Sequence, residues 1–178
     1  LVTLPQVLDA AGVREAILYG HSDGGSIALI HAGGVGGARV RGLVLEAPHV
    51  FVEDISVESI ARAGENFARG TLRRALERHH GANVECAFWG WNRVWLDPDF
   101  RSWNIEGYLP NVRVPVLVIQ GDDDEYGTLQ QVESIRRGCR APVRTLILPD
   151  CGHSPHRESP QLTLEAVASF LRTHARPA

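Results

Sequence analysis

The sequence predicts an α/β protein whose parallel strands alternate with helices. Four short apolar runs are typical of strands buried on both faces of a parallel sheet: 16–19, 42–46, 114–119 and 143–148. Segments with helical spacing of apolar residues separate these runs, and the stretch from 51 to 108 predicts helices without strands. The 178 residues, 44% hydrophobic and 22% charged, have the size and balance of an ordinary globular chain.

The first third of the chain predicts a helix, a strand and a second helix. Apolar residues recur at helical spacing over 1–11, and Gly12 stands where a helix commonly ends. The strand at 16–19 stops at a glycine, and a helix is expected over 26–32. The glycine-rich stretch 33–37 predicts a loop. It differs from a phosphate-binding loop because it follows a helix and lacks the Lys-Ser/Thr ending.

The rest of the chain predicts a helical insertion, followed by a return to alternating strands and helices. Helices are expected within the insertion and after it: 57–69, 71–80, 84–95, 129–137 and 160–172. The insertion contains all four tryptophans: Trp89, Trp91, Trp95 and Trp103. We therefore expect three parts: a first core segment at 1–50, the helical insertion at 51–108, and a second core segment at 109–178.

Charge and composition exclude several classes of protein. The net charge is −3 and no basic stripe is present, which argues against nucleic-acid binding. The apolar runs are much shorter than the roughly 20 residues that a membrane span needs, and no signal peptide is visible. Cys86, Cys139 and Cys151 are odd in number and far apart, which favours reduced thiols in a cytoplasmic protein. We expect no cofactor and no metal, because the consecutive carboxylates at 122–125 cannot all face one ion.

The sequence Gly20-His21-Ser22-Asp23-Gly24, followed by Gly25, lies where a strand ends and a helix begins. A nucleophilic serine at such a turn needs a strained backbone that holds its side chain out of the sheet. Small residues are expected two positions before and two after it, because a Cβ there would clash as the helix doubles back. If Ser22 points out, His21 is expected to point away. The N–H of Asp23, at the positive end of the helix, is placed to bind an oxyanion.

A serine nucleophile needs a base, and the base needs a carboxylate to orient it. Among the eight histidines, only His153 follows a strand late in the chain, at the same sheet edge as the serine. His49 also follows a strand, and it is a weaker competitor that could line the pocket. His79 and His80 are expected on the surface, and His31 at a helix end.

The orienting carboxylate is expected where the third strand ends. Four acidic residues stand there: Asp122, Asp123, Asp124 and Glu125. Glu46, at the end of the second strand, is an alternative. The residues by themselves leave this choice open.

Together these motifs resemble the α/β-hydrolase superfamily over essentially all 178 residues. The nucleophile elbow of that family matches 20–24. Its acid strand, a Pro-apolar run ending in Gly-x-x-Asp, matches 115–121 and implies that Asp124 is the acid. Its late Gly-His, followed by a Glu-x-Pro turn, matches Gly152-His153 and Glu158-Ser159-Pro160. The chain order of serine, aspartate and histidine is also that of this superfamily.

The resemblance implies a helical cap at 51–108 and an esterase-like branch. The Ser-Asp-Gly-Gly elbow and the Leu-Glu-Ala-Pro-His run at 45–49 are similar to the biphenyl-hydrolase-like and valacyclovirase-like esterases. The expected substrate contacts are the cap tryptophans Trp89, Trp95 and Trp103, together with His49.

The resemblance also implies that the chain holds the carboxyl-terminal half of the family's parallel sheet, about four strands. In that fold the elbow strand is the fifth of eight, whereas here one predicted helix precedes it and the sequence contains no Met. The expected missing half-sheet carries a loop that supplies a second oxyanion N–H, and a complete fold needs this half. We therefore expect 1–178 by itself to be an incomplete fragment with little activity.

The expected function is hydrolysis of a small carboxylic ester through an acyl-enzyme on Ser22. His153 would act as the base and Asp124 as the orienting acid. One alternative uses the same triad for carbon–carbon bond hydrolysis of ring-cleavage products or for cofactor-free perhydrolysis. Another is a non-catalytic binding protein on the same fold. Nucleic acid and membrane are not expected as partners.

Overall fold

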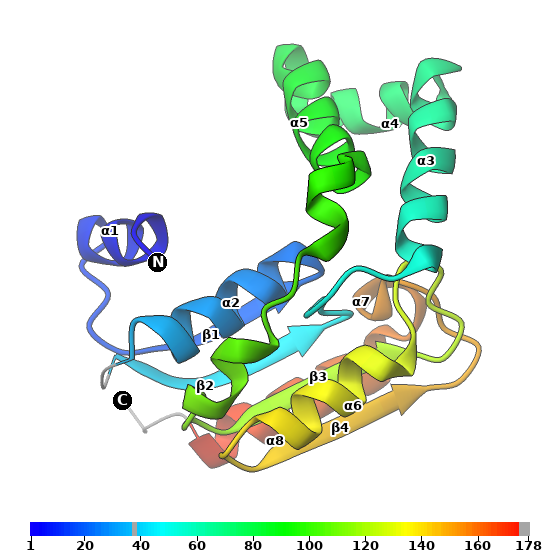
Figure 1. Ribbon diagram of the computed structural model, residues 1–178. Helices are drawn as coiled ribbons and strands as arrows, with labels where there is room; N and C mark the ends of the chain where they lie inside the picture. The colour runs from blue at the N-terminus through cyan, green and yellow to red at the C-terminus, as the bar shows by residue number, and fades with distance from the viewer. Residues whose placement is uncertain (37–38, 175–178) are drawn as a thin grey trace. The chain divides into compact units, whose positions relative to one another are not determined.

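The computed structural model describes residues 1–36 and 39–174. The chain divides into two compact units, one made of Leu1–Phe51 with Asn104–Ala178 and the other of Val52–Trp103. Strands and helices alternate in the first unit, whereas the described elements of the second are helices (Figure 1). The α/β class predicted from the alternating pattern is confirmed.

The sheet has four parallel strands in the order β1-β2-β3-β4 (Figure 1): β1 (Ala16–His21), β2 (Val40–Glu46), β3 (Val116–Gly121) and β4 (Val143–Leu148). His21 is paired with Glu46, and Gly121 with Leu148, so β1 and β2 end level with each other, as do β3 and β4. Every residue of β3 is buried, as expected for a central strand that is covered on both faces. Four parallel strands agree with the half-sheet that the resemblance to the α/β-hydrolase superfamily implies.

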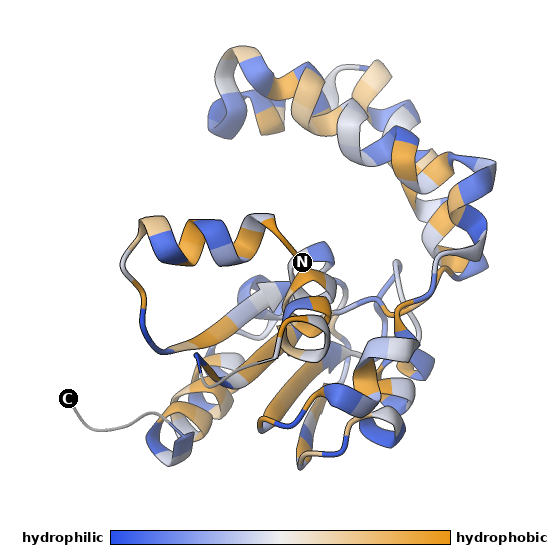
Figure 2. Ribbon diagram, turned by 60° about the vertical axis from the view of Figure 1, so that its left-hand side comes forward, coloured by the Kyte–Doolittle hydropathy of each residue, from blue (hydrophilic) through white to orange (hydrophobic). Residues whose placement is uncertain are grey.

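Helices cover both faces of the sheet (Figure 1). α2 (Asp23–Gly34) and α6 (Leu129–Gly138) lie on one face, and α8 (Pro160–His174) lies on the other. Phe170 of α8 belongs to a buried apolar cluster with Val44 and Leu117 of the strands. In Figure 2 hydrophobic and hydrophilic residues alternate along the helices, as expected when one side of each helix is buried. α1 (Thr3–Ala10) precedes β1 and ends close to the residue predicted from the sequence.

Two glycines that were expected in a loop, Gly33 and Gly34, are the last residues of α2. A Cβ on Gly33 would lie 2.3 Å from the carbonyl oxygen of Tyr108 in the short 3-10 helix η3 (Glu106–Asn111). The loop prediction is therefore wrong for these two residues, because close approach of α2 to η3 selects glycine there. Gly36, with a φ of 67°, does turn the chain after the helix, and Gly37 lies outside the described residues.

The second unit contains three helices, α3 (Asp54–Ala68), α4 (Thr71–His80) and α5 (Val84–Leu96), and two 3-10 turns, η1 (Gly81–Asn83) and η2 (Pro98–Ser102). The helices start and end close to the predicted positions. Phe67 of α3 and Phe88 of α5 stack with their ring centroids 3.9 Å apart. Trp89 and Trp91 pack edge-on against Phe88, so these two tryptophans contribute to the apolar core of the unit.

Candidate active site

Ser22 lies at the tight turn between β1 and α2. Its φ of 55° and ψ of −123° form a conformation that residues with a side chain rarely adopt. Main-chain hydrogen bonds hold the turn: the Ser22 N–H donates to the Glu46 carbonyl (2.9 Å), and the Ser22 carbonyl accepts from the Gly25 N–H (2.8 Å). α2 begins at Asp23, so the positive end of this helix lies beside the serine.

The glycines around the serine differ in how much room they have. A Cβ on Gly20 would lie 2.3 Å from the carbonyl oxygen of Gly24, and a Cβ on Gly25 would lie 2.9 Å from the Cβ of Pro48. A Cβ on Gly24 would meet nothing within 4 Å. The expectation that a Cβ two residues after the serine would clash is therefore wrong. The helix turns the carbonyl of Gly24 toward β1, and the close packing falls on Gly25 instead.

The structure brings Ser22, His153 and Asp124 together. Nε2 of His153 lies 3.0 Å from Oγ of Ser22, and Nδ1 lies 2.9 Å from both carboxylate oxygens of Asp124. With Nδ1 donating to the carboxylate, Nε2 is left to accept the serine proton. The three side chains come from the end of β1, the loop after β3 and the loop after β4.

Asp124 is held by groups that keep its carboxylate in one orientation. Its side chain is fully buried. Nε2 of Gln120 donates to Oδ2 (2.7 Å), and the N–H groups of Tyr126 (2.8 Å) and Gly127 (3.3 Å) donate to Oδ1. These three donors fix the orientation in which the two carboxylate oxygens meet Nδ1 of His153. The other acidic residues of the run, Asp122, Asp123 and Glu125, are exposed.

Glu46, the alternative acid, contacts a different histidine. Its Oε2 lies 2.9 Å from Nδ1 of His156, and its side chain is fully buried. His156 was not predicted from the sequence. A histidine three residues after His153, at the start of a short helix, carries no pattern of its own, and its partner is 110 residues away along the chain.

His21 faces the site, which contradicts the expectation that it points away. Its Nε2 donates to the carbonyl oxygen of His153 (2.7 Å), and the two rings lie 5.0 Å apart between centroids. Alternation of side chains applies to extended residues. The alternation does not apply to His21 and Ser22, because Ser22 is not in the extended conformation and its side chain therefore does not point opposite to that of His21. Burial lowers the pKa of His21, which favours the neutral ring that donates through Nε2.

Two further side chains near the triad were missed from the sequence. Gln120 is a polar residue inside the otherwise apolar β3, and that contrast could have indicated its bond to Asp124. The ring of Tyr126 lies 4.7 Å from the ring of His153. No sequence pattern pointed to this contact, because it depends on how two loops meet.

The predicted pocket residues divide between the two units. His49 is 3% exposed, and its ring centroid lies 5.7 Å from that of His153. Trp89, Trp95 and Trp103 lie in the helical unit, where Trp95 packs edge-on against Trp103 at 5.8 Å. Their role as substrate contacts stays a prediction. His31, expected at a helix end, lies buried in the last turn of α2.

The lowered pKa of His49 predicts that the stability of the folded chain depends on pH. Burial, and secondly the neighbouring His153, lower the pKa of His49 from 6.5 to about 4. Between these values the unfolded chain binds a proton that the folded chain does not. The stabilisation is therefore complete above pH 6.5 and is lost as the pH falls toward 4. We expect this group to lower the free energy of unfolding by about 2 kcal/mol between roughly pH 7.5 and 5.

Urea titrations at the two pH values measure this effect. His49→Gln is expected to show a pH-dependent loss smaller than that of the original chain by about 2 kcal/mol. The matched control is His79→Gln, in the exposed part of α4, which should keep the original dependence. An unchanged pH dependence in His49→Gln would show that His49 titrates normally in the folded chain.

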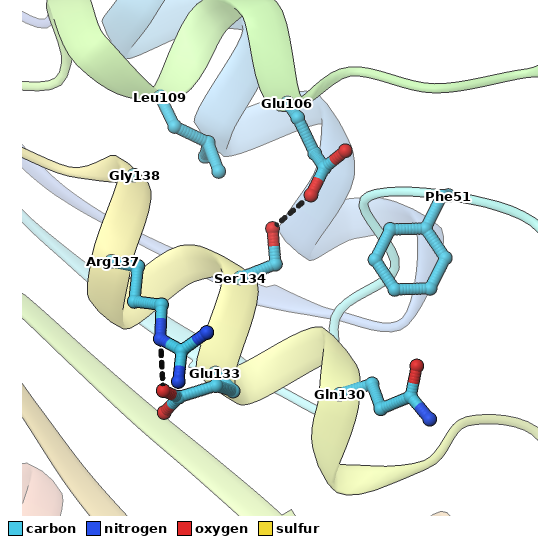
Figure 3. Close-up of a pocket in the computed structure, with 8 residues that line it drawn as sticks. All are labelled: Phe51, Glu106, Leu109, Gln130, Glu133, Ser134, Arg137 and Gly138. Carbon is cyan, nitrogen blue, oxygen red and sulfur yellow. Dashed lines mark hydrogen bonds and ion pairs between the residues drawn. The ribbon is translucent and has the colours of Figure 1, made fainter.

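A surface pocket of about 440 Å³ lies between η3 and α6 in the sheet unit (Figure 3). It is lined by Phe51, Glu106, Leu109, Gln130, Glu133, Ser134, Arg137 and Gly138. Its charged groups are already engaged within the pocket: Oγ of Ser134 donates to Glu106 (2.5 Å), and Arg137 pairs with Glu133. None of the triad residues lines this pocket, so we assign it no part in the chemistry.

Over 1–36 and 39–174, no three histidine, cysteine, aspartate or glutamate side chains are grouped so that they could hold a metal ion. Within the same residues no helix combines the length and the apolar character that crossing a membrane requires.

The family model described as alpha/beta hydrolase family matches residues 2–166. The chain belongs to the alpha/beta hydrolase family. The match covers both core segments and the helical unit, as the motif positions had implied. Among curated proteins, none matches the sequence with significance.

Solved structures of two esterases and an enol-lactonase share the fold. A thermophilic esterase from Thermogutta terrifontis is 22% identical with a TM-score of 0.67, covering 96% of this chain and 70% of that chain. The esterase RhEst1 from Rhodococcus sp. ECU1013 is 24% identical with a TM-score of 0.67, covering 95% and 70%. The enol-lactonase from Burkholderia xenovorans LB400 is 18% identical with a TM-score of 0.67, covering 95% and 70%. At such identities the likeness concerns the fold.

Proposed function

We propose that the protein is a serine hydrolase that cleaves a small carboxylic ester, or a related acyl compound, through an acyl-enzyme on Ser22. The observation that carries the proposal is the continuous chain of hydrogen bonds from Ser22 Oγ to His153 Nε2 (3.0 Å) and from His153 Nδ1 to Asp124 (2.9 Å). A serine hydroxyl is a weak nucleophile until an adjacent base removes its proton, and this arrangement supplies that base.

The proposed reaction has two halves. Oγ of Ser22 attacks the acyl carbonyl while His153 takes its proton, and the protonated His153 then gives the proton to the departing alcohol. Water, deprotonated by His153, hydrolyses the acyl-enzyme and regenerates the serine. Asp124 holds Nδ1 and stabilises the imidazolium that forms in each half.

The oxyanion of the tetrahedral intermediate would be bound by the backbone N–H of Asp23 at the start of α2. In the family pattern, a second N–H donor for the oxyanion comes from a separate loop. None of the described residues matches that loop. Removing one such donor typically costs about 10²- to 10³-fold in turnover.

We infer the substrate class from the names of the similar structures. Two are called esterases and one an enol-lactonase, and both names denote cleavage of a carboxylic ester bond. The helical unit would serve as the family's cap and contribute the apolar residues Trp89, Trp95 and Trp103 as substrate contacts. His49 of the sheet unit is the fourth proposed substrate contact. The finer branch within the family stays a prediction.

A fluorophosphonate probe tests the proposal independently of turnover. Such a probe reacts with an activated serine, forming an O–P bond as fluoride leaves. We expect one label per chain of 1–178 and none in Ser22→Ala. The matched control Ser169→Ala, in α8, should be labelled like the original chain. Equal labelling of Ser22→Ala would contradict Ser22 as the nucleophile, and no labelling of a folded original chain would contradict an activated serine in it.

A further inference from the structure

A second carboxylate–histidine pair lies beside the triad. Oε2 of Glu46, at the end of β2, is 2.9 Å from Nδ1 of His156. The Glu46 side chain is fully buried, whereas that of His156 is 41% exposed. A buried carboxylate is costly without a hydrogen-bonded partner, so the pair ties His156 firmly to the end of β2. The catalytic chain of hydrogen bonds does not use this pair.

His156 belongs to α7 (Pro155–Glu158), a helix of one turn. A helix this short has almost no stability of its own, so tertiary contacts must hold it in place. Two such contacts fix its two sides: His156 bonds Glu46, and Oγ1 of Thr163 donates to the carbonyl of Pro155 (3.1 Å). The Glu46–His156 pair is therefore one of the contacts that hold α7 in place.

α7 in turn holds the main chain on both sides of His153. The carboxylate of Glu158 accepts the N–H of Gly152 through Oε2 (2.8 Å) and the N–H of Ser154 through Oε1 (3.0 Å). Because these two residues flank His153, movement of Glu158 would shift the ring of His153 relative to Ser22. A displacement of about 1 Å at such a distance costs a large part of the rate.

His21 links the two histidine pairs. Its ring lies 5.0 Å from that of His153 and 5.2 Å from that of His156, edge-on to the latter. Its Nε2 donates to the carbonyl of His153 (2.7 Å). The phenol of Tyr19, on the same strand, faces Glu46: burial, and secondly a hydrogen bond to Glu46, raises its pKa. The groups around Glu46 therefore come from β1 and α7 together.

We propose that Glu46 and His156 are positioning residues, and that their pair holds α7 so that Glu158 sets the loop 152–154 and keeps His153 Nε2 within reach of Ser22. This inference rests on the proposed function, because it assigns the pair to the same triad. Neither residue touches the reacting atoms. Their effect passes through the main chain around His153.

His156→Phe tests the proposal, since it keeps a ring of similar size and removes the bond to Glu46. We expect the maximal rate of Ser22 labelling by a fluorophosphonate to fall by about 10- to 100-fold, as for other residues that orient a catalytic ligand. The probe concentration at half-maximal rate should stay unchanged. His156→Asn, whose amide N–H stands near the position of Nδ1, should restore most of the rate. His79→Phe, on the surface of the helical unit, should have no effect.

A second readout does not need activity. The Nδ1 proton of His153, hydrogen-bonded to Asp124, can be followed by proton NMR and assigned by its disappearance in His153→Gln. We expect this signal to shift or broaden in His156→Phe and to return in His156→Asn. It should be unchanged in His79→Phe. If the original chain is not labelled at all, the proposed function fails, while the NMR signal still decides whether His156 positions His153.

The positioning role is overturned if folded His156→Phe keeps both the original labelling rate and the original His153 signal. If His156→Phe does not fold, His156→Gln is measured in its place, because its longer amide does not overlay Nδ1. Loss of rate with a shifted His153 signal in that variant supports the proposal. Unchanged values for both overturn it.

Discussion

Replacing His153 with alanine is expected to lower the rate at which a fluorophosphonate labels Ser22 by about 10⁴-fold or more. Nε2 of His153 is the group within 3.0 Å of the serine Oγ, and removing it leaves the hydroxyl without a base. The neighbouring His49 is not expected to replace it, because burial lowers the pKa of that ring and makes it a weak base. Pseudo-first-order labelling rates over a range of probe concentrations measure the effect.

The same experiment tests whether the three residues act as one unit. Asp124→Asn by itself should also slow labelling strongly, because the amide can no longer hold the Nδ1 proton of His153. In the His153→Ala background, however, Asp124→Asn should cost little more, because its partner is already gone. His79→Ala serves as the control and should label normally. Fully additive losses would mean that Asp124 acts on Ser22 by some route other than His153.

Gly20→Ala is expected to destabilise the chain by about 3 kcal/mol or more. The new Cβ would lie 2.3 Å from the carbonyl oxygen of Gly24 and 2.6 Å from the N of Gly25. These contacts are with backbone atoms, which cannot rotate away as a side chain would. Either β1 or the first turn of α2 must move, and the strained conformation of Ser22 depends on both.

The chain provides a matched control for this prediction four residues later. Gly24→Ala adds the same methyl group where nothing lies within 4 Å, and it lies in a helix. Its free energy of unfolding should therefore change by less than about 1 kcal/mol. Urea denaturation followed by circular dichroism compares both variants with the original chain. Similar midpoints for Gly20→Ala and Gly24→Ala would show that the elbow tolerates a Cβ before the serine.

Features that depend on neighbouring residues could be predicted from the sequence. The four strands follow from apolar runs that end at glycine or proline, and the turn at Ser22 follows from a strand, small residues and a helix in succession. Asp124 needed the family pattern, since four acidic side chains stand together. The glycine run at the end of α2 misled the prediction, because the constraint on Gly33 is a contact with Tyr108 far along the chain.

The sequence by itself determined the class of fold, the order of its elements and the side chains that end up at the triad, because each of these has a local pattern or a family motif. Only the tertiary structure decided which histidine each carboxylate meets. Glu46 ends β2 and Asp124 follows β3, and the parallel pairing of these two strands brings both residues to one edge of the sheet. The loop after β4 and the single turn of α7 then place His153 on Asp124 and His156 on Glu46. Such pairings between residues far apart in the chain depend on the register and packing of whole elements, which no local pattern encodes.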